Sequence, residues 1–177
     1  MDEGIACTKS RPMPALTLAP HHRAVKTYYQ DLHQLDLLYH SSEGGVSPAF
    51  ATLLRHCAHQ CHWTLAEQYP LKRGQRTIYP DGALLDTFRL VHGWWEAKDT
   101  GDDLAQEVRK KFDQGYPQNN ILFQAPERAI LWRDGHRLCD EDISPTHPGR
   151  LVHVLKEFFA YEPPEAYPIV KTKKSDN

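Results

Sequence analysis

Apolar residues recur at three- and four-residue spacing in four stretches of the chain, the pattern of amphipathic helices. The first stretch runs from His21 to His40, and the residues SSEGG at 41–45 break it. The second begins at Ser47-Pro48 and is expected to end near Cys61. The other two predicted helices lie further along the chain, at 104–116 and 149–162.

Short runs rich in aromatic, aliphatic and β-branched residues predict strands between these helices. Segment 77–98 is expected to form two strands joined around Val91-His92-Gly93, and LKRGQR at 71–76 is expected to be a turn. The other predicted strands are 64–69, 120–124 and 128–135. This order predicts one α/β domain in which a mixed β-sheet is flanked by α-helices.

A length of 177 residues suits a single domain with a real hydrophobic core. We expect the domain at residues 19–165, after a disordered segment at 1–18 and before a polar tail or linker end at 166–177. The N-terminus has acids and prolines where a signal peptide needs an apolar core, and no apolar run is long enough to cross a bilayer. A cytoplasmic location is therefore expected.

The formal net charge of −2 excludes a uniformly basic nucleic-acid-binding surface. Any such surface must be a local patch or depend on bound cations. Two basic clusters could form such patches, and they are Lys72, Arg73 and Arg76 before residue 81 and Arg109, Lys110 and Lys111 after residue 98.

Cys57 and Cys61 stand four residues apart on the second predicted helix, beside His56, His59 and His62. Cysteine and histidine at this spacing could bind zinc. Alternatively, the two cysteines are small apolar residues on a buried helix face. The chain has no second ligand pair of recognisable spacing, and both interpretations stay open.

An aromatic strand segment leads into Glu96, Ala97 and Lys98. Asp81 lies on the preceding strand of the predicted hairpin. Because residues i and i+2 of a strand point to the same face, Glu96 and Lys98 share one face. An unpaired charge on a covered sheet face is unfavourable, so a functional site is a better explanation for these residues than a structural core.

Two carboxylates from Asp81 and Glu96 could hold Mg²⁺, for which Mn²⁺ may substitute, with the backbone carbonyl of Ala97 as a further ligand. Such a site serves phosphodiester hydrolysis. Lys98 would orient or help deprotonate the attacking water and offset developing charge on the phosphate. Asp81, Glu96 and Lys98 are therefore the predicted catalytic residues.

The residues Pro80-Asp81…Glu96-Ala97-Lys98 resemble the signature of the PD-(D/E)XK nuclease superfamily. A narrower resemblance is to the N-terminal nuclease domain of Type ISP single-chain restriction-modification enzymes. It is carried by PDG at 80–82, GWWEAKDT at 93–100, DDLAQEVRKKFDQGYPQNNILF at 102–123 and VHVLKEFFAYEPPE at 152–165.

This resemblance implies a restriction-endonuclease-like core, with a mixed β-sheet flanked by α-helices, and a metal-dependent DNA endonuclease domain of a restriction-modification system. It also implies partner domains in a larger enzyme: a helicase-like ATPase, a methyltransferase and a target-recognition part. The chain itself has no G-x-x-x-x-G-K-[ST] and no N-P-P-Y motif. An inactive nuclease-fold module that binds DNA or docks domains is the alternative, and a structural domain with a chance motif is a third interpretation.

Several alternative site residues remain open. Asp86 competes with Asp81 as the first acid, because a simple hairpin would place Asp86 near Glu96. Glu43 or Glu67 could supply an additional acid. In the superfamily resembled, the helix after the hairpin commonly faces the DNA backbone, which suggests three phosphate contacts: Gln106, Lys110 and Lys111.

Overall fold

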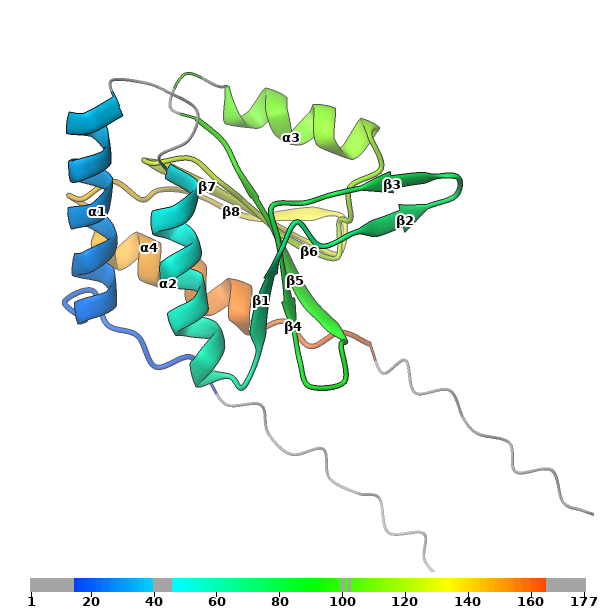
Figure 1. The fold of residues 1–177 in the computed structure, drawn as a ribbon, viewed down its shortest axis with the longest axis horizontal. Coiled ribbons are helices and arrows are strands. Elements are labelled where there is room, and N and C mark those ends of the chain that lie inside the picture. Colours follow the sequence, from blue (N-terminus) through cyan, green and yellow to red (C-terminus); the bar gives the residue numbers. More distant parts are fainter. Residues whose placement is uncertain (1–14, 40–45, 100, 102, 165–177) are drawn as a thin grey trace, which may run out of the picture.

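The computed structural model describes residues 15–39, 46–99, 101 and 103–164 (Figure 1). In these ranges the elements are, in chain order, α1 (Arg23–Tyr39), α2 (Val46–Gln60), β1 (Thr64–Glu67), β2 (Leu71–Arg73), β3 (Arg76–Ile78), β4 (Gly82–Leu85), β5 (Val91–Ala97), α3 (Leu104–Asp113), β6 (Asn120–Gln124), β7 (Arg128–Arg133), β8 (His136–Asp142) and α4 (Pro148–Phe159). The predicted α/β class is confirmed, with a mixed six-stranded sheet flanked by helices that is compatible with a restriction-endonuclease-like core.

The sheet has the strand order β1-β4-β5-β6-β7-β8, which places β5 and β6 at its centre. The β5–β6 pair is parallel, and every other neighbouring pair in this sheet is antiparallel. A parallel pair needs a crossover connection, and here α3 supplies it. The chain therefore crosses one face of the sheet directly after Glu96 and Lys98.

Hydrophobic side chains cover both faces of the sheet, and β5 contributes to each in turn (Figure 1). Trp95 packs in a cluster with residues of α1, α2 and α4. Trp94 packs in a second cluster on the other face, with Leu104 and Val108 of α3. By the same alternation, Glu96 and Lys98 lie on the α3 face. The three-layer packing thus turns the candidate residues toward α3.

The hairpin of β4 and β5 turns at residues 86–90, not around Val91-His92-Gly93 as the sequence predicts. Asp86 closes this turn, because its Oδ1 accepts hydrogen bonds from the backbone N–H of Phe88 (2.8 Å) and Leu90 (2.9 Å). Gly93 lies inside β5. In the sequence it suggested a turn because glycine is common in turns. Its real role is close packing, since an added Cβ would lie 2.6 Å from Cε2 of Phe158.

We therefore expect Gly93→Ala to lower the free energy of unfolding by about 1–3 kcal/mol, the range for overpacking a filled core. The aromatic ring of Phe158 is buried on α4 and has little room to move. Urea denaturation measures the change, with Gly101→Ala as the matched control because a Cβ there meets no atom within 4 Å. Equal midpoints for the two variants would contradict this account of Gly93.

Segment 71–76, predicted as a turn, instead belongs to a hairpin in which β2 and β3 pair antiparallel. Gly74 turns the chain in the left-handed region, at a φ of 58°. β8 was also not predicted; it is an edge strand in which exposed and half-buried residues dominate. Neither the hairpin nor β8 has the alternating apolar positions by which a strand is identified in sequence.

The segment expected to be disordered, residues 1–18, is described only from residue 15 onward. Leu16 and Leu18 are buried in the cluster that contains Trp95, so the packed part of the chain begins before residue 19. The expected tail at 166–177 lies outside the described residues. No helix among the described residues is long and apolar enough to span a membrane.

Candidate active site

Strand pairing places Asp81 directly beside the end of β5. Gly82 of β4 pairs with Trp95 of β5, so the preceding residue, Asp81, lies level with Glu96. The Oδ2 of Asp81 accepts a hydrogen bond from the backbone N–H of Ala97 at 2.8 Å. Just before β4 begins, the Asp81 carboxylate therefore accepts the hydrogen bond that a backbone carbonyl of the neighbouring strand would otherwise accept from Ala97.

Gln68, which follows β1, holds Asp81 from the other side. Its side-chain Nε2 donates to Oδ1 of Asp81 at 3.1 Å, and its backbone N–H donates to the Asp81 carbonyl at 3.0 Å. The backbone of Gln68 has a φ of 50°, in the left-handed region that non-glycine residues seldom adopt. The carboxylate orientation of Asp81 is thus set by two neighbouring segments.

Glu96 is buried, with a relative exposure of 3%, on a central strand. Its Oε1 lies 3.0 Å from Nζ of Lys98 and 2.5 Å from Nζ of Lys111. Its Oε2 is buried and has no hydrogen-bond partner. One carboxylate therefore faces two ammonium groups through one oxygen and presents the other oxygen without a partner.

Lys111 and Tyr116 extend this cluster from α3 and the segment after it. Nζ of Lys111 donates to the Tyr116 hydroxyl at 3.1 Å and lies 4.7 Å from the centre of the Tyr116 ring. Burial, then the charges of Glu96 and Asp81, raise the pKa of Tyr116, so its hydroxyl stays protonated near neutral pH.

Asp81 and Glu96 influence each other electrostatically. Burial, followed by the charge of Glu96, raises the pKa of Asp81 above its usual value. The hydrogen bond from Ala97 and the charges of Lys98 and Lys111 oppose this shift without cancelling it. Two carboxylates held this close are a feature of sites that bind a cation or share a proton.

The raised pKa predicts a stability effect of Asp81→Asn in EDTA. Between the unfolded and the folded pKa, the folded chain binds a proton that the unfolded chain has lost, so stability decreases as the pH rises through this window. We therefore expect the variant to have a higher Tm than the wild type at neutral pH. The gain should shrink as the pH falls through the raised pKa. Calorimetry over a pH series measures it, and a gain of the same size at every pH contradicts it.

Asp86, the alternative first acid, lies in the 86–90 turn at the other end of β5. Its Oδ2 is 3.2 Å from Nε2 of His92, whose ring stacks on Trp63 at a centroid distance of 4.1 Å. Asp86 thus belongs to the turn and its packing, and the structure brings only Asp81 to Glu96.

The remaining candidate residues fall in different places. Gln106 and Lys110 are exposed on α3, and Nζ of Lys110 lies 2.6 Å from Glu107. Lys111, predicted with them as a phosphate contact, instead turns inward to Glu96. Glu67 pairs with Arg55, and Glu43 lies outside the described residues.

Cys57 and Cys61 are both buried in the cluster that contains Trp95. Burial, then the neighbouring Cys61, raises the pKa of Cys57 to about 12, which disfavours the thiolate that a metal requires. Nowhere in the described ranges do three or more His, Cys, Asp or Glu side chains group so that they could hold a metal ion. The packing matches the second interpretation, that of small apolar residues.

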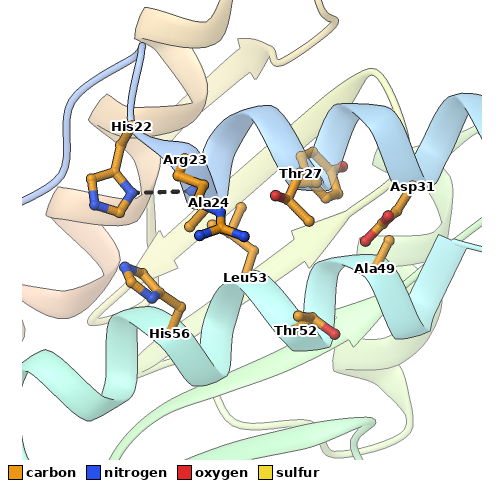
Figure 2. A pocket seen from close by; sticks show the side chains of 10 residues that line it. His22, Arg23, Ala24, Thr27, Asp31, Ala49, Thr52, Leu53 and His56 are labelled. Atoms are coloured by element: carbon orange, nitrogen blue, oxygen red, sulfur yellow. Dashed lines mark hydrogen bonds between the residues drawn. The ribbon is translucent and has the colours of Figure 1, made fainter.

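A pocket between α1 and α2 has a volume of about 350 Å³ and is shown in Figure 2. His22 and His56 lie at one end, with ring centroids 5.0 Å apart, and Asp31 lies at the other. None of the predicted catalytic residues lines it. The candidate site is therefore the cluster at the end of β5.

The sequence matches no protein-family model and no curated protein. It is similar to part of a chain in a cryo-EM structure of a DrdV–DNA complex, with a TM-score of 0.75 and 32% sequence identity. The match covers 80% of this chain and 14% of that chain, so the present chain spans about one-seventh of the length of the protein to which it is similar.

Lys111 and Tyr116 belong to the cluster around Glu96 but were not predicted as part of it. Lys111 could have been found, because Leu104, Val108 and Lys111 follow at four and three residues and so lie on one helix face. Tyr116 and Gln68 have no comparable signal. Gln68 follows β1 and Tyr116 follows α3. The direction of each side chain depends on a backbone turn with positive φ, at Gln68 itself and at Gly115, respectively.

Proposed function

We propose that this chain is a metal-dependent DNA endonuclease domain of the PD-(D/E)XK type, working in a restriction-modification system. The observation that carries the proposal is the buried Glu96 carboxylate on a central strand, with Asp81 beside it and Lys98 at 3.0 Å. The similarity to part of a protein solved with DNA supports DNA as the substrate.

The residues present fit a divalent cation. Oε2 of Glu96 is buried without a partner, which is unfavourable unless a further group binds it. Asp81 supplies a second carboxylate, and all donors are oxygen atoms, which Mg²⁺ and Mn²⁺ prefer. N–H and C=O of one strand residue point to the same side, so the Ala97 carbonyl faces the side of Asp81. Asp81, Glu96 and the Ala97 carbonyl would hold the ion.

The chemistry that Mg²⁺ supplies in such sites is polarisation of the scissile phosphate and activation of water. Lys98, held beside Glu96, would orient the attacking water, help to take its proton and offset the negative charge that develops on the phosphate. Gln68 and the Ala97 N–H fix the direction of the Asp81 carboxylate. In the hydrolysis, the water oxygen bonds to phosphorus while one P–O ester bond breaks.

The two other interpretations make different demands on the site. A chance motif predicts a charge pair at an exposed edge, whereas Glu96 is 3% exposed on a strand with neighbours on both sides. A module that only binds DNA or docks domains has no need for two adjacent carboxylates and a lysine. The complete set therefore favours cleavage over both.

The other partners proposed for this chain are domains of a larger enzyme. The match covers 14% of the neighbour's chain, so a domain of this size can form a small part of a long polypeptide. A helicase-like ATPase, a methyltransferase and a target-recognition part are the proposed remainder, and the choice of the cleaved site would belong to them.

The test is nicking of supercoiled plasmid by the purified chain with Mg²⁺, with Mn²⁺ and with EDTA. We expect nicking with either metal and none with EDTA. No nicking by a folded chain that nevertheless binds Mn²⁺ in calorimetry would point to a nuclease that needs its larger enzyme. Neither nicking nor metal binding would contradict the proposal.

Lys111 is expected to matter for nicking where Lys156 does not. Its ammonium lies against Glu96 and Tyr116, so Lys111→Met should leave the carboxylate less well positioned and lower the rate by about tenfold to a hundredfold. Lys156→Met removes the same charge from an exposed position on α4, which packs on the opposite face of the sheet. Plasmid nicking at saturating metal compares the two, and equal rates would show that Lys111 has no role in positioning Glu96.

A further inference from the structure

The hairpin of β2 and β3 carries a concentration of positive charge that no acidic side chain of the described residues balances. Its sequence LKRGQRTI contains Lys72, Arg73 and Arg76 and no acid, in a chain whose net charge is −2. All three side chains are exposed. Within the described ranges, none of them forms an ion pair with an acidic side chain.

The arrangement of these charges is unfavourable for the isolated hairpin. Arg73 and Arg76 are direct cross-strand partners, and like charges directly opposite each other destabilise a strand pair. Lys72 pairs with Thr77 and points to the opposite face, so both faces of the hairpin present a cation. An anion bound along the hairpin would relieve this repulsion.

The hairpin is firmly attached beside the candidate site. Leu71 and Ile78 pack against the cluster that contains Trp94, and Nε of Arg73 donates to the Gly115 carbonyl at 3.0 Å. Gly115 immediately precedes Tyr116, which contacts Lys111 at Glu96. At its other end the hairpin continues through Pro80 into Asp81.

The position of the hairpin leaves it open to a large partner. Figure 1 shows it projecting beyond the six-stranded sheet, next to the end of α3, while α1 lies at the opposite side of the molecule. A rigid, basic projection that leads directly into a phosphodiester-cleaving site matches the charge of a nucleic-acid backbone.

We infer that the β2–β3 hairpin binds the phosphate backbone of duplex DNA next to the candidate active site. Lys72 on one face of the hairpin and Arg76 on the other would each contact a phosphate on one side of a groove, which is wide enough for a two-stranded ribbon. Arg73 holds the hairpin to the end of α3 and adds its charge. The contact is to phosphates, so it positions the duplex without reading its sequence. The choice of DNA as the partner rests on the proposed function.

The test measures binding of a short, fluorescently labelled DNA duplex in EDTA, where no cleavage occurs. The variant Lys72→Gln/Arg76→Gln is compared with Arg23→Gln/Lys26→Gln, which removes the same charge from exposed positions on α1. At about 0.1 M salt each lost phosphate contact weakens binding by roughly eightfold, so the hairpin variant should bind up to about sixtyfold more weakly. Its slope of log K against log salt should fall by about 2, and the α1 variant should match the wild type.

A charge-preserving variant, Lys72→Arg/Arg76→Lys, should bind as the wild type does, which separates loss of charge from loss of fold. Equal affinities for the hairpin and α1 variants would overturn the inference, as would a hairpin effect with duplex RNA alone. Plasmid nicking by the wild type in Mg²⁺ tests the proposed function independently. A chain that neither nicks nor binds Mn²⁺, but loses DNA affinity in the hairpin variant, keeps the inference and removes the nuclease.

Discussion

Glu96→Gln is expected to abolish metal-dependent nicking of plasmid, with a loss of at least about a thousandfold. The substitution keeps the size of the side chain but removes the charge of the buried carboxylate that faces Lys98 and Lys111. The unpartnered Oε2 is also lost as an anionic ligand, so the affinity for Mn²⁺ in calorimetry should fall with the activity. A drop in both properties would mark Glu96 as a metal ligand.

The matched control is Glu157→Gln on α4, which lies on the opposite face of the sheet and is partly exposed. It should nick at the wild-type rate. Removing Glu96 also leaves two lysines without their carboxylate partner, so circular dichroism and Tm must show that the variant is folded. Full nicking by a folded Glu96→Gln chain would contradict the assignment of this residue.

A comparison of Asp81→Asn with Asp86→Asn should separate the two candidates for the first acid. We expect Asp81→Asn to nick at least about a hundredfold more slowly than the wild type, because it loses the Asp81 carboxylate that lies beside Glu96. Asp86→Asn should nick at nearly the wild-type rate, since Asp86 accepts hydrogen bonds from its own turn and contacts His92 at the far end of β5. Each variant removes one negative charge, at opposite ends of the β4–β5 hairpin.

Nicking rates at several metal concentrations complete this comparison. If Asp81 binds the metal, raising the Mn²⁺ concentration should recover part of the activity of Asp81→Asn and should change Asp86→Asn no more than the wild type. The assignment would be reversed if Asp86→Asn were the inactive variant while remaining folded.

The sequence was sufficient to predict that candidate residues lie together where their spacing along the chain determines their direction. Glu96 and Lys98 are two apart on a strand, so their common face follows from strand geometry alone. The choice between Asp81 and Asp86 required the position of the turn. Gly93 misled that prediction, because a glycine needed for contact with a distant phenylalanine looks the same in sequence as a glycine needed for a turn.

Elements with little buried surface were the ones that the sequence did not predict. β8 is a largely exposed edge strand, and its pairing with β7 depends on backbone hydrogen bonds more than on an apolar face. The β2–β3 hairpin buries only parts of Leu71 and Ile78. Periodicity detects burial, so strands of this kind leave only a weak trace in a single sequence.

The residues that converge on Glu96 all come from one continuous part of the chain, from Gln68 to Tyr116. Both ends of the described chain lie at the bottom of the view in Figure 1, whereas α3 lies at the top. Further polypeptide joined at either end would therefore leave from the side of the domain that lies away from α3. A neighbouring domain attached there would leave α3, and the Lys111 that it turns toward Glu96, uncovered.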